Sequence, residues 1–284
     1  MTTVAEALSP PRPRRRVGRQ ALALVRRHAL TVYALLALLY LLLPIAVVAL
    51  FSFNDPRGRF NYVWQGFTWD NWVRWDAVPG LRSALETSLE IAALSSVGAT
   101  ALGTLMGLAL VRYSFRGRSA ANLFVFLPMA TPEIVLGSAL LALFLTMTAA
   151  LGFWTILVAH VMFNVSYVVV TVKARLIGFD RHLEEAAMDL GANEWTTFRK
   201  VTLPLIAPGV LSALLLSFAL SVDDFVITNF VAGTTVTFPL FVWGAARVGA
   251  PPQVNVIGTA IFVIAVGVML VNVLVNIRRA KGVP

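Results

Sequence analysis

The chain has 284 residues, of which 58% are hydrophobic and 13% are charged, and its mean hydropathy is +0.79. Soluble domains contain roughly 45–50% apolar and about 25% charged residues, so the composition excludes a soluble protein of this size. The absence of cysteine excludes a disulfide scaffold, thiolate metal sites and cysteine nucleophiles. The net charge of +9 would suit a nucleic-acid-binding protein, but the 23 Lys and Arg residues lie between hydrophobic segments, which argues against nucleic acid as a partner.

Six hydrophobic segments are long enough to cross a membrane. A bilayer core about 30 Å thick needs roughly 20 apolar residues, because a helix rises by about 1.5 Å per residue. The segments lie near Ala29–Phe53, Ser83–Val111, Ala120–Met147, Phe153–Val172, Leu205–Phe230 and Val254–Ile277. The sequence therefore predicts an all-α integral membrane protein, with a six-helix transmembrane domain over residues 29–277.

The basic residues predict how these helices are oriented. Alternating the loops between the two sides places 18 Lys and Arg residues on one side and five on the other. The positive-inside rule then puts both termini in the cytoplasm. The amino-terminal arm (residues 1–28) is rich in Arg and Pro, so we expect it to be disordered and to touch anionic lipid. Residues 278–284 form a cytoplasmic tail.

One predicted outward loop, Asn54–Leu81, is crowded with aromatic residues. They are Phe60, Tyr62, Trp64, Phe67, Trp69, Trp72 and Trp75. Aromatic side chains gather at membrane interfaces. Docking of an external partner is a second interpretation, and the two are compatible.

A polar segment, Phe179–Pro208, is predicted to lie on the cytoplasmic side. Asp180 and Asn193 are typical N-cap residues, and Gly191 suits the left-handed stop of a helix. Pro204 stands where the next membrane helix begins. The segment therefore predicts two short helices outside the membrane.

The first of these helices carries an apolar stripe. Leu183, Ala187 and Leu190 fall on one helical face. A solvated loop has no need of such a stripe, so we expect it to dock onto a partner.

The spacing in this segment resembles the EAA loop of permease subunits of bacterial ABC importers. Glu185-Ala186-Ala187 is followed after three residues by Gly191 and, further on, by Val201 and Leu203-Pro204. Valine replaces the isoleucine usual in the family. The resemblance implies the MetI-like fold of a type I importer permease, whose coupling helix within residues 179–204 docks into a groove of a cytoplasmic ATPase. The residues implied in this contact are Glu184, Glu185, Ala186, Ala187, Gly191, Leu203 and Pro204.

The chain contains no phosphate-binding G-x-x-x-x-G-K-[ST] loop. We therefore expect a transport subunit that is not an enzyme and has no cofactor of its own. The resemblance implies that ATP and Mg²⁺ bind to the partner ATPase subunits.

Five acidic residues are predicted to lie in the outer half of the membrane, and no Lys or Arg lies at a matching depth within a span. They are Glu86, Glu90, Glu133, Asp223 and Asp224. A charge at the bilayer centre costs about 2.5–3.5 kcal/mol on insertion scales, so such acids mark functional sites by default. They are either protonated or hydrated at helix ends, or they face a path for a cation. Asp223 and Asp224 point roughly 100° apart, so only one faces a path squarely.

Around these acids, the sequence resembles the second permease subunit (PotC type) of spermidine/putrescine importers. The matching runs are Arg112–Gly117, Thr131–Val135, Ser221–Val226 and Arg247–Asn255, and similarity extends from about Phe51 to Asn276. Glu133 replaces an aspartate of the family and Pro251-Pro252 doubles a proline, so the exact amine stays open.

The resemblance implies a polyamine path lined by the five acids. Trp243 and Phe225 are candidate aromatic faces for ammonium groups, or they pack in the core.

Four smaller features carry structural expectations. Pro128 and Pro132 should kink the third span beside Glu133. Gly103 and Gly107, four residues apart, should allow two helices to pack closely. His160 and Asn164 are expected to form a hydrogen-bonded core pair. The three histidines of the chain are scattered, so no metal site is predicted.

The expected function is therefore import of spermidine or putrescine through the bacterial cytoplasmic (inner) membrane. The implied partners are a homologous second permease, a cytoplasmic ATPase dimer and an external polyamine-binding protein. Two alternatives stay open. One is the same importer with another solute, such as an iron complex, a thiamine-like cation or an organic anion. The other is a secondary transporter or channel that works alone.

Overall fold

Apolar runs fold into helices throughout the chain, because a helix satisfies its own backbone hydrogen bonds inside a membrane. The computed structural model describes residues 16–58, 60–178 and 180–281. Five described helices are long and apolar enough to cross a membrane, or six if one sharply bent pair is a single span. Two units are formed: a central unit, Asp76–Pro251, and a terminal unit built from the chain before and after it.

The terminal unit contains α1 (Arg16–Phe51), α2 (Asp70–Val73) and α12 (Pro252–Lys281), with α12 in contact with both other helices. Residues 1–15 of the expected disordered arm lie outside the described residues. From Arg16 onward the arm is helical, because it is rich in Arg, Ala and Leu, which favour helices, and it runs directly into the first span.

The aromatic loop of the terminal unit is folded around asparagine side chains. Asn54 Nδ2 donates to Asn61 Oδ1 (2.6 Å), and Asn71 Nδ2 donates to the Asn54 carbonyl oxygen (2.8 Å). The ring of Phe53 stacks on those of Phe67 and Trp72. Other aromatic side chains of the loop, Phe60, Tyr62, Trp64 and Trp69, are exposed, as both interpretations of the loop require.

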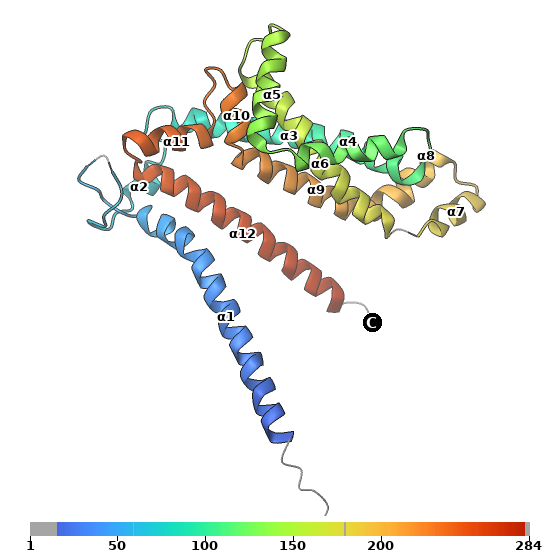
Figure 1. The fold of residues 1–284 in the computed structure, drawn as a ribbon, viewed down its shortest axis with the longest axis horizontal. Coiled ribbons are helices and arrows are strands. Elements are labelled where there is room, and N and C mark those ends of the chain that lie inside the picture. Colours follow the sequence, from blue (N-terminus) through green and yellow to red (C-terminus); the bar gives the residue numbers. More distant parts are fainter. Residues whose placement is uncertain (1–15, 59, 179, 282–284) are drawn as a thin grey trace, which may run out of the picture. The chain divides into compact units, whose positions relative to one another are not determined.

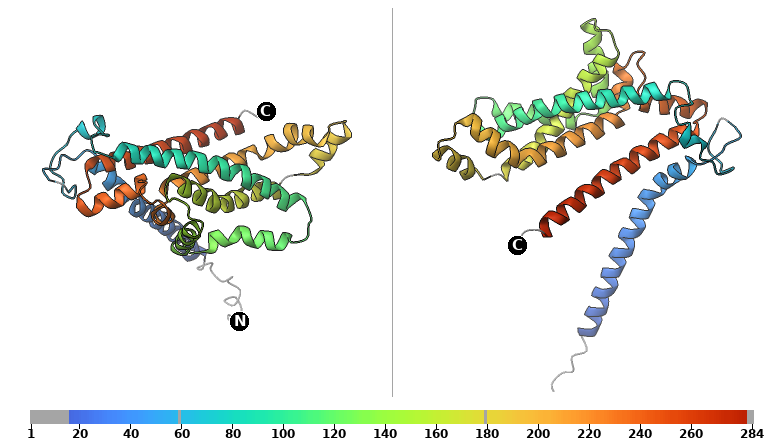
Figure 2. Two further views of the ribbon diagram at one scale, coloured as in Figure 1. Left: turned by 90° about the horizontal axis from the view of Figure 1, so that it is seen from above. Right: turned by 180° about the vertical axis from the view of Figure 1, so that it is seen from behind.

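The core of the central unit is a bundle of α3 (Leu81–Arg112), α6 (Phe153–Ile177) and α9 (Leu203–Asp223), which lie side by side in Figures 1 and 2. A Cβ atom on Gly103 would lie 2.6 Å from Val168 Cγ1, and one on Gly107 would contact Val172. The predicted close packing at these glycines is therefore confirmed.

The third predicted span is not one kinked helix. It consists of α4 (Arg118–Ala130) and α5 (Glu133–Thr146), which meet at 107°. Pro132 causes the break, because proline has no N–H and forces the preceding residue, here Thr131, into extended backbone. Figure 1 shows α5 projecting away from the bundle.

The fifth span is also shorter than predicted. It ends at Asp223 and not at Phe230, because Asp224 is extended and a separate helix, α10 (Val226–Val231), follows. The short helix α10 packs against α5 and α6. The sequence analysis also missed α11 (Phe238–Val248), which begins with proline in its first turn and is too short to span a bilayer.

The close approach at Gly103 is directly testable. Gly103→Ala places a methyl group against Val168 and the Val165 carbonyl oxygen, so it should destabilise the bundle by about 1–3 kcal/mol. The control is Gly244→Ala, where a Cβ would meet nothing within 4 Å. Thermal unfolding of the purified protein should show a lower melting temperature for Gly103→Ala only. Equal melting temperatures would contradict the packing.

Candidate functional site

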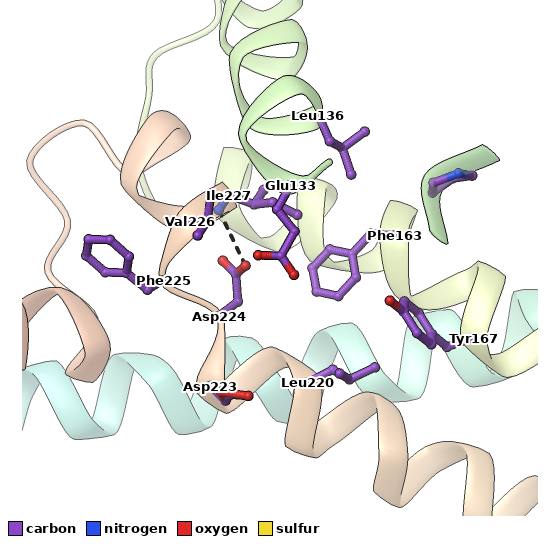
Figure 3. A pocket seen from close by; sticks show the side chains of 11 residues that line it. Glu133, Leu136, Phe163, Tyr167, Leu220, Asp223, Asp224, Phe225, Val226 and Ile227 are labelled. Atoms are coloured by element: carbon purple, nitrogen blue, oxygen red, sulfur yellow. Dashed lines mark hydrogen bonds between the residues drawn. The ribbon is translucent and has the colours of Figure 1, made fainter. Parts of the chain in front are cut away.

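The two breaks in the central unit come together around a cavity of about 230 Å³ (Figure 3). One side is formed by the junction of α4 and α5, the other by the corner between α9 and α10. The lining residues are Pro128, Glu133, Leu136, Phe163, Tyr167, Leu220, Asp223, Asp224, Phe225, Val226 and Ile227. Among these described residues three are acidic and none is Lys or Arg, so the cavity has a negative potential that attracts cations.

The three acids reach the cavity from different positions. In Figure 3 the Glu133 carboxylate, at the first residue of α5, points toward Asp224. Asp223 is the last residue of α9 and is exposed, whereas the side chain of Asp224 is only 7% exposed. The structure thus brings together three of the five acids singled out in the sequence.

Asp224 is held by the first turn of α10 and by a histidine. Its Oδ2 accepts hydrogen bonds from the Thr228 backbone N–H (2.8 Å) and hydroxyl (2.7 Å), and Oδ1 accepts from the Ile227 N–H (3.4 Å). His160 Nε2 on α6 lies 3.3 Å from Oδ2. The lack of Lys or Arg at this depth therefore does not leave Asp224 without a partner, because a histidine of another span contacts it.

His160 is the residue of this site that the sequence analysis missed. It was expected to bond Asn164, but its ring contacts Ser221 (2.6 Å) and Thr228 (2.9 Å), and the Asn164 amide has no hydrogen-bond partner among the described residues. A signal was present: His160 lies seven residues into α6, roughly 10 Å from its outer end, a depth that resembles the one expected for Asp223.

The remaining residues of the expected path do not line this cavity. Glu86 is hydrogen-bonded to Arg82 (2.8 Å), one turn earlier on α3, so it is not unpaired, and Glu90 is exposed on the same helix. Trp243 on α11 packs against Phe225, with 5.2 Å between ring centroids. The guanidinium of Arg247 lies 4.7 Å from the Trp243 ring centroid.

The polar segment after α6 forms the two predicted short helices, but the N-cap position of the first is Arg181 and not Asp180, whose Oδ1 accepts from the His182 N–H (3.0 Å). It forms α7 (His182–Asp189) and α8 (Glu194–Thr197), then a π-helical turn, Phe198–Thr202, that runs into α9. Gly191 adopts a left-handed φ of 89°, and Asn193 Oδ1 caps α8 by accepting from the Thr196 N–H (2.8 Å). Leu190 is 90% exposed, so part of the apolar stripe has no cover in the described chain.

Glu184 joins the segment to the membrane helices. Its carboxylate contacts the Arg112 guanidinium at the end of α3 and the Thr202 hydroxyl just before α9. These side chains are largely withdrawn from solvent. A displacement of α7 would therefore act directly on α3 and α9, two helices of the bundle.

Residues 99–280 match the family described as binding-protein-dependent transport system inner membrane component. The chain belongs to this family. It is 40% identical to the spermidine/putrescine transport system permease protein PotC of Haemophilus influenzae, over 84% of this chain and 92% of that protein. The corresponding PotC of Escherichia coli is 39% identical over 86% of this chain and 92% of that protein. These relatives confirm the resemblance found in the sequence.

Further similarity is found to a putrescine permease and to solved transporters. The putrescine transport system permease protein PotI of Escherichia coli is 37% identical over 84% of this chain and 88% of that protein. A bacterial ABC transporter involved in the import of alginate has a similar fold, with a TM-score of 0.63, 16% identity and coverage of 92% of this chain and 98% of that chain. The all-α permease fold is thereby confirmed, and the chain is a multi-pass membrane protein.

The charge of the cavity can be tested by labelling, since the permease has no cysteine of its own. Asp223→Cys should react roughly tenfold faster with a cationic thiosulfonate reagent than with an anionic one, because Glu133 and Asp224 remain nearby. Met147→Cys, exposed at the end of α5, supplies the intrinsic ratio of the two rates. Equal ratios at both positions would contradict a negatively charged cavity.

Proposed function

We propose that this permease passes polyamines such as spermidine and putrescine through the bacterial inner membrane. The observation that carries the proposal is the cavity between the two broken helices, with three carboxylates and no Lys or Arg among its described lining residues. The permeases named for spermidine and putrescine in Haemophilus influenzae and Escherichia coli are 37–40% identical to this chain, which supports a cargo of the same chemical class.

The cavity suits a flexible cation that has to leave again. Ammonium groups pair with carboxylates and lie against aromatic faces, and Phe163 and Tyr167 line the wall beside Glu133. A transport path needs a few sites of modest affinity, because tight binding would prevent release. We place Glu133 and Asp223 at the centre of the path. Glu90 and Glu86, nearer the outer end of α3, then lie toward its entrance.

The proposal includes three kinds of partner. A homologous second permease completes the path, an external binding protein delivers the amine, and a cytoplasmic ATPase dimer binds ATP and Mg²⁺. The exposed stripe on α7 supports the last contact, since Leu183 and Leu190 are uncovered in the described chain. Closure of the ATPase would reach α3 and α9 through α7 and Glu184.

Uptake of labelled putrescine and spermidine tests the cargo. The permease is expressed with its neighbouring operon subunits in cells that lack their own polyamine importers. Hydrogen bonds to charged groups contribute about 1.5–3 kcal/mol, so Asp223→Asn and Glu133→Gln should each lower uptake roughly tenfold or more. Asp55→Asn, an exposed acid in the aromatic loop, is the matched control. An assembled, ATP-hydrolysing complex that takes up neither amine would contradict the proposal and indicate another solute.

A second set of variants tests the coupling to the ATPase. Leu190→Asp puts a charge on the exposed stripe without disturbing a buried contact, so uptake should fall at least tenfold while the permease still inserts. Val63→Asp, at a position 65% exposed on the aromatic loop, should retain uptake. The permease is quantified in the membrane and in pull-downs with the ATPase. Full uptake with Leu190→Asp would favour a transporter that works alone.

A further inference from the structure

We infer that His160 is a positioning residue of the transport path: it holds Asp224, and with it the corner between α9 and α10, so that Asp223 and Glu133 are the acids that meet the cargo. That Asp223 and Glu133 meet a transported amine rests on the proposed function. The geometric part, that His160 fixes the corner, stands on the contacts alone.

The hydroxyl protons assign a direction to the hydrogen bonds around His160. The Thr228 hydroxyl has one proton, which it donates to Asp224 Oδ2 (2.7 Å), so its oxygen is left to accept from His160 Nε2–H (2.9 Å). Ser95 donates to the Ser221 oxygen (3.0 Å), so the Ser221 proton is available for His160 Nδ1 (2.6 Å). A neutral imidazole with its proton on Nε2 therefore provides a hydrogen-bond partner for every side chain in this series, which we call the relay.

The hydrogen bonds of this relay connect four helices to the carboxylate of Asp224. It starts at Ser95 on α3, passes Ser221 on α9 and His160 on α6, and reaches Asp224 through Thr228 on α10. Ser95, Ser221, His160 and Thr228 are all buried. Buried polar groups of this kind are costly to leave unpaired, so the relay resists any displacement of the corner.

The relay gives the adjacent acids Asp223 and Asp224 different roles. The Asp224 carboxylate accepts three hydrogen bonds from the chain and contacts the imidazole, and the side chain is only 7% exposed, so it has little capacity left for a ligand. Asp223 and Glu133 line the same cavity, are exposed, and form no hydrogen bond or ion pair with another described residue. The sequence left open which of the adjacent aspartates faces the path, and these contacts favour Asp223.

The first arm of the test compares variants of His160 in the assembled transporter. The Gln amide nitrogen reaches the position of Nε2, whereas Asn reaches only that of Nδ1. His160→Asn should therefore lower the maximal uptake rate about tenfold, and His160→Gln should restore most of it. Thr228→Val, which interrupts the relay, should behave like His160→Asn. Thr171→Val, whose hydroxyl bonds only the Tyr167 carbonyl oxygen on α6, is the control.

Double variants separate positioning from direct contact with the amine. If His160 acts through Asp224, then His160→Asn/Asp224→Asn should be no slower than either single variant, to within about twofold. His160→Asn/Asp223→Asn should instead show the product of the two losses. Independent losses for the first pair, or equal uptake by His160→Asn and wild type, would overturn the inference.

A second arm needs no transport. Ile227, at the corner, is 2% exposed, so Ile227→Cys should be unreactive toward a maleimide in the complex. Adding His160→Asn should make it reactive, and adding His160→Gln should not. Val231→Cys, buried at the far end of α10, should stay protected throughout. If wild type takes up no amine but Ile227→Cys responds in this way, only the cargo assignment fails. If labelling is the same in all three backgrounds, the positioning role fails.

Discussion

The structure depends on how the backbone is satisfied where two membrane helices break. A helix end inside a membrane leaves N–H and C=O groups without partners, and lipid supplies none. At the corner after α9, the Asp224 carboxylate accepts the N–H groups of Ile227 and Thr228 and so begins α10. The Thr228 hydroxyl also donates to this carboxylate, and His160 holds that hydroxyl in place, with its Nε2 atom 3.3 Å from Asp224 Oδ2. The break, the buried acid and the histidine therefore form one unit.

The second break supplies the opposite wall of the cavity. Pro132 ends the run of α4, and Glu133 becomes the first residue of α5, so an acid stands at the exposed start of a helix. The helix dipole favours a negative charge at that end, which lowers the cost of keeping Glu133 in the membrane. The short helix α10 packs against α5, and this contact brings both breaks to the same cavity. The two helix breaks thus place three acidic residues around one cavity.

The same bundle connects the cavity with the cytoplasmic segment. Ser95, midway along α3, and Ser221, near the end of α9, belong to the relay. Glu184 of α7 contacts Arg112 at the end of α3 and Thr202 just before α9. Small residues such as Gly103 let α3 and α6 pack closely. A closely packed bundle is hardly compressible, so it transmits a displacement of one helix to its neighbours. We therefore expect a displacement of α7 to be transmitted through the bundle to the corner between α9 and α10.

Many of the helices and helix ends of this protein can be predicted from short stretches of its sequence. Hydrophobic length predicted the spans. Local spacing predicted the two short helices and the stop at Gly191, and proline predicted a kink beside Glu133, where the structure has two separate helices. These features depend on residues close together in the chain, where propensity and spacing act directly. The partner of Asp224 did not follow, because His160 is separated from it along the chain and meets it only when α6 packs against α9 and α10. The choice between adjacent acids likewise depends on tertiary contacts, since neighbours of equal charge differ only in what surrounds them.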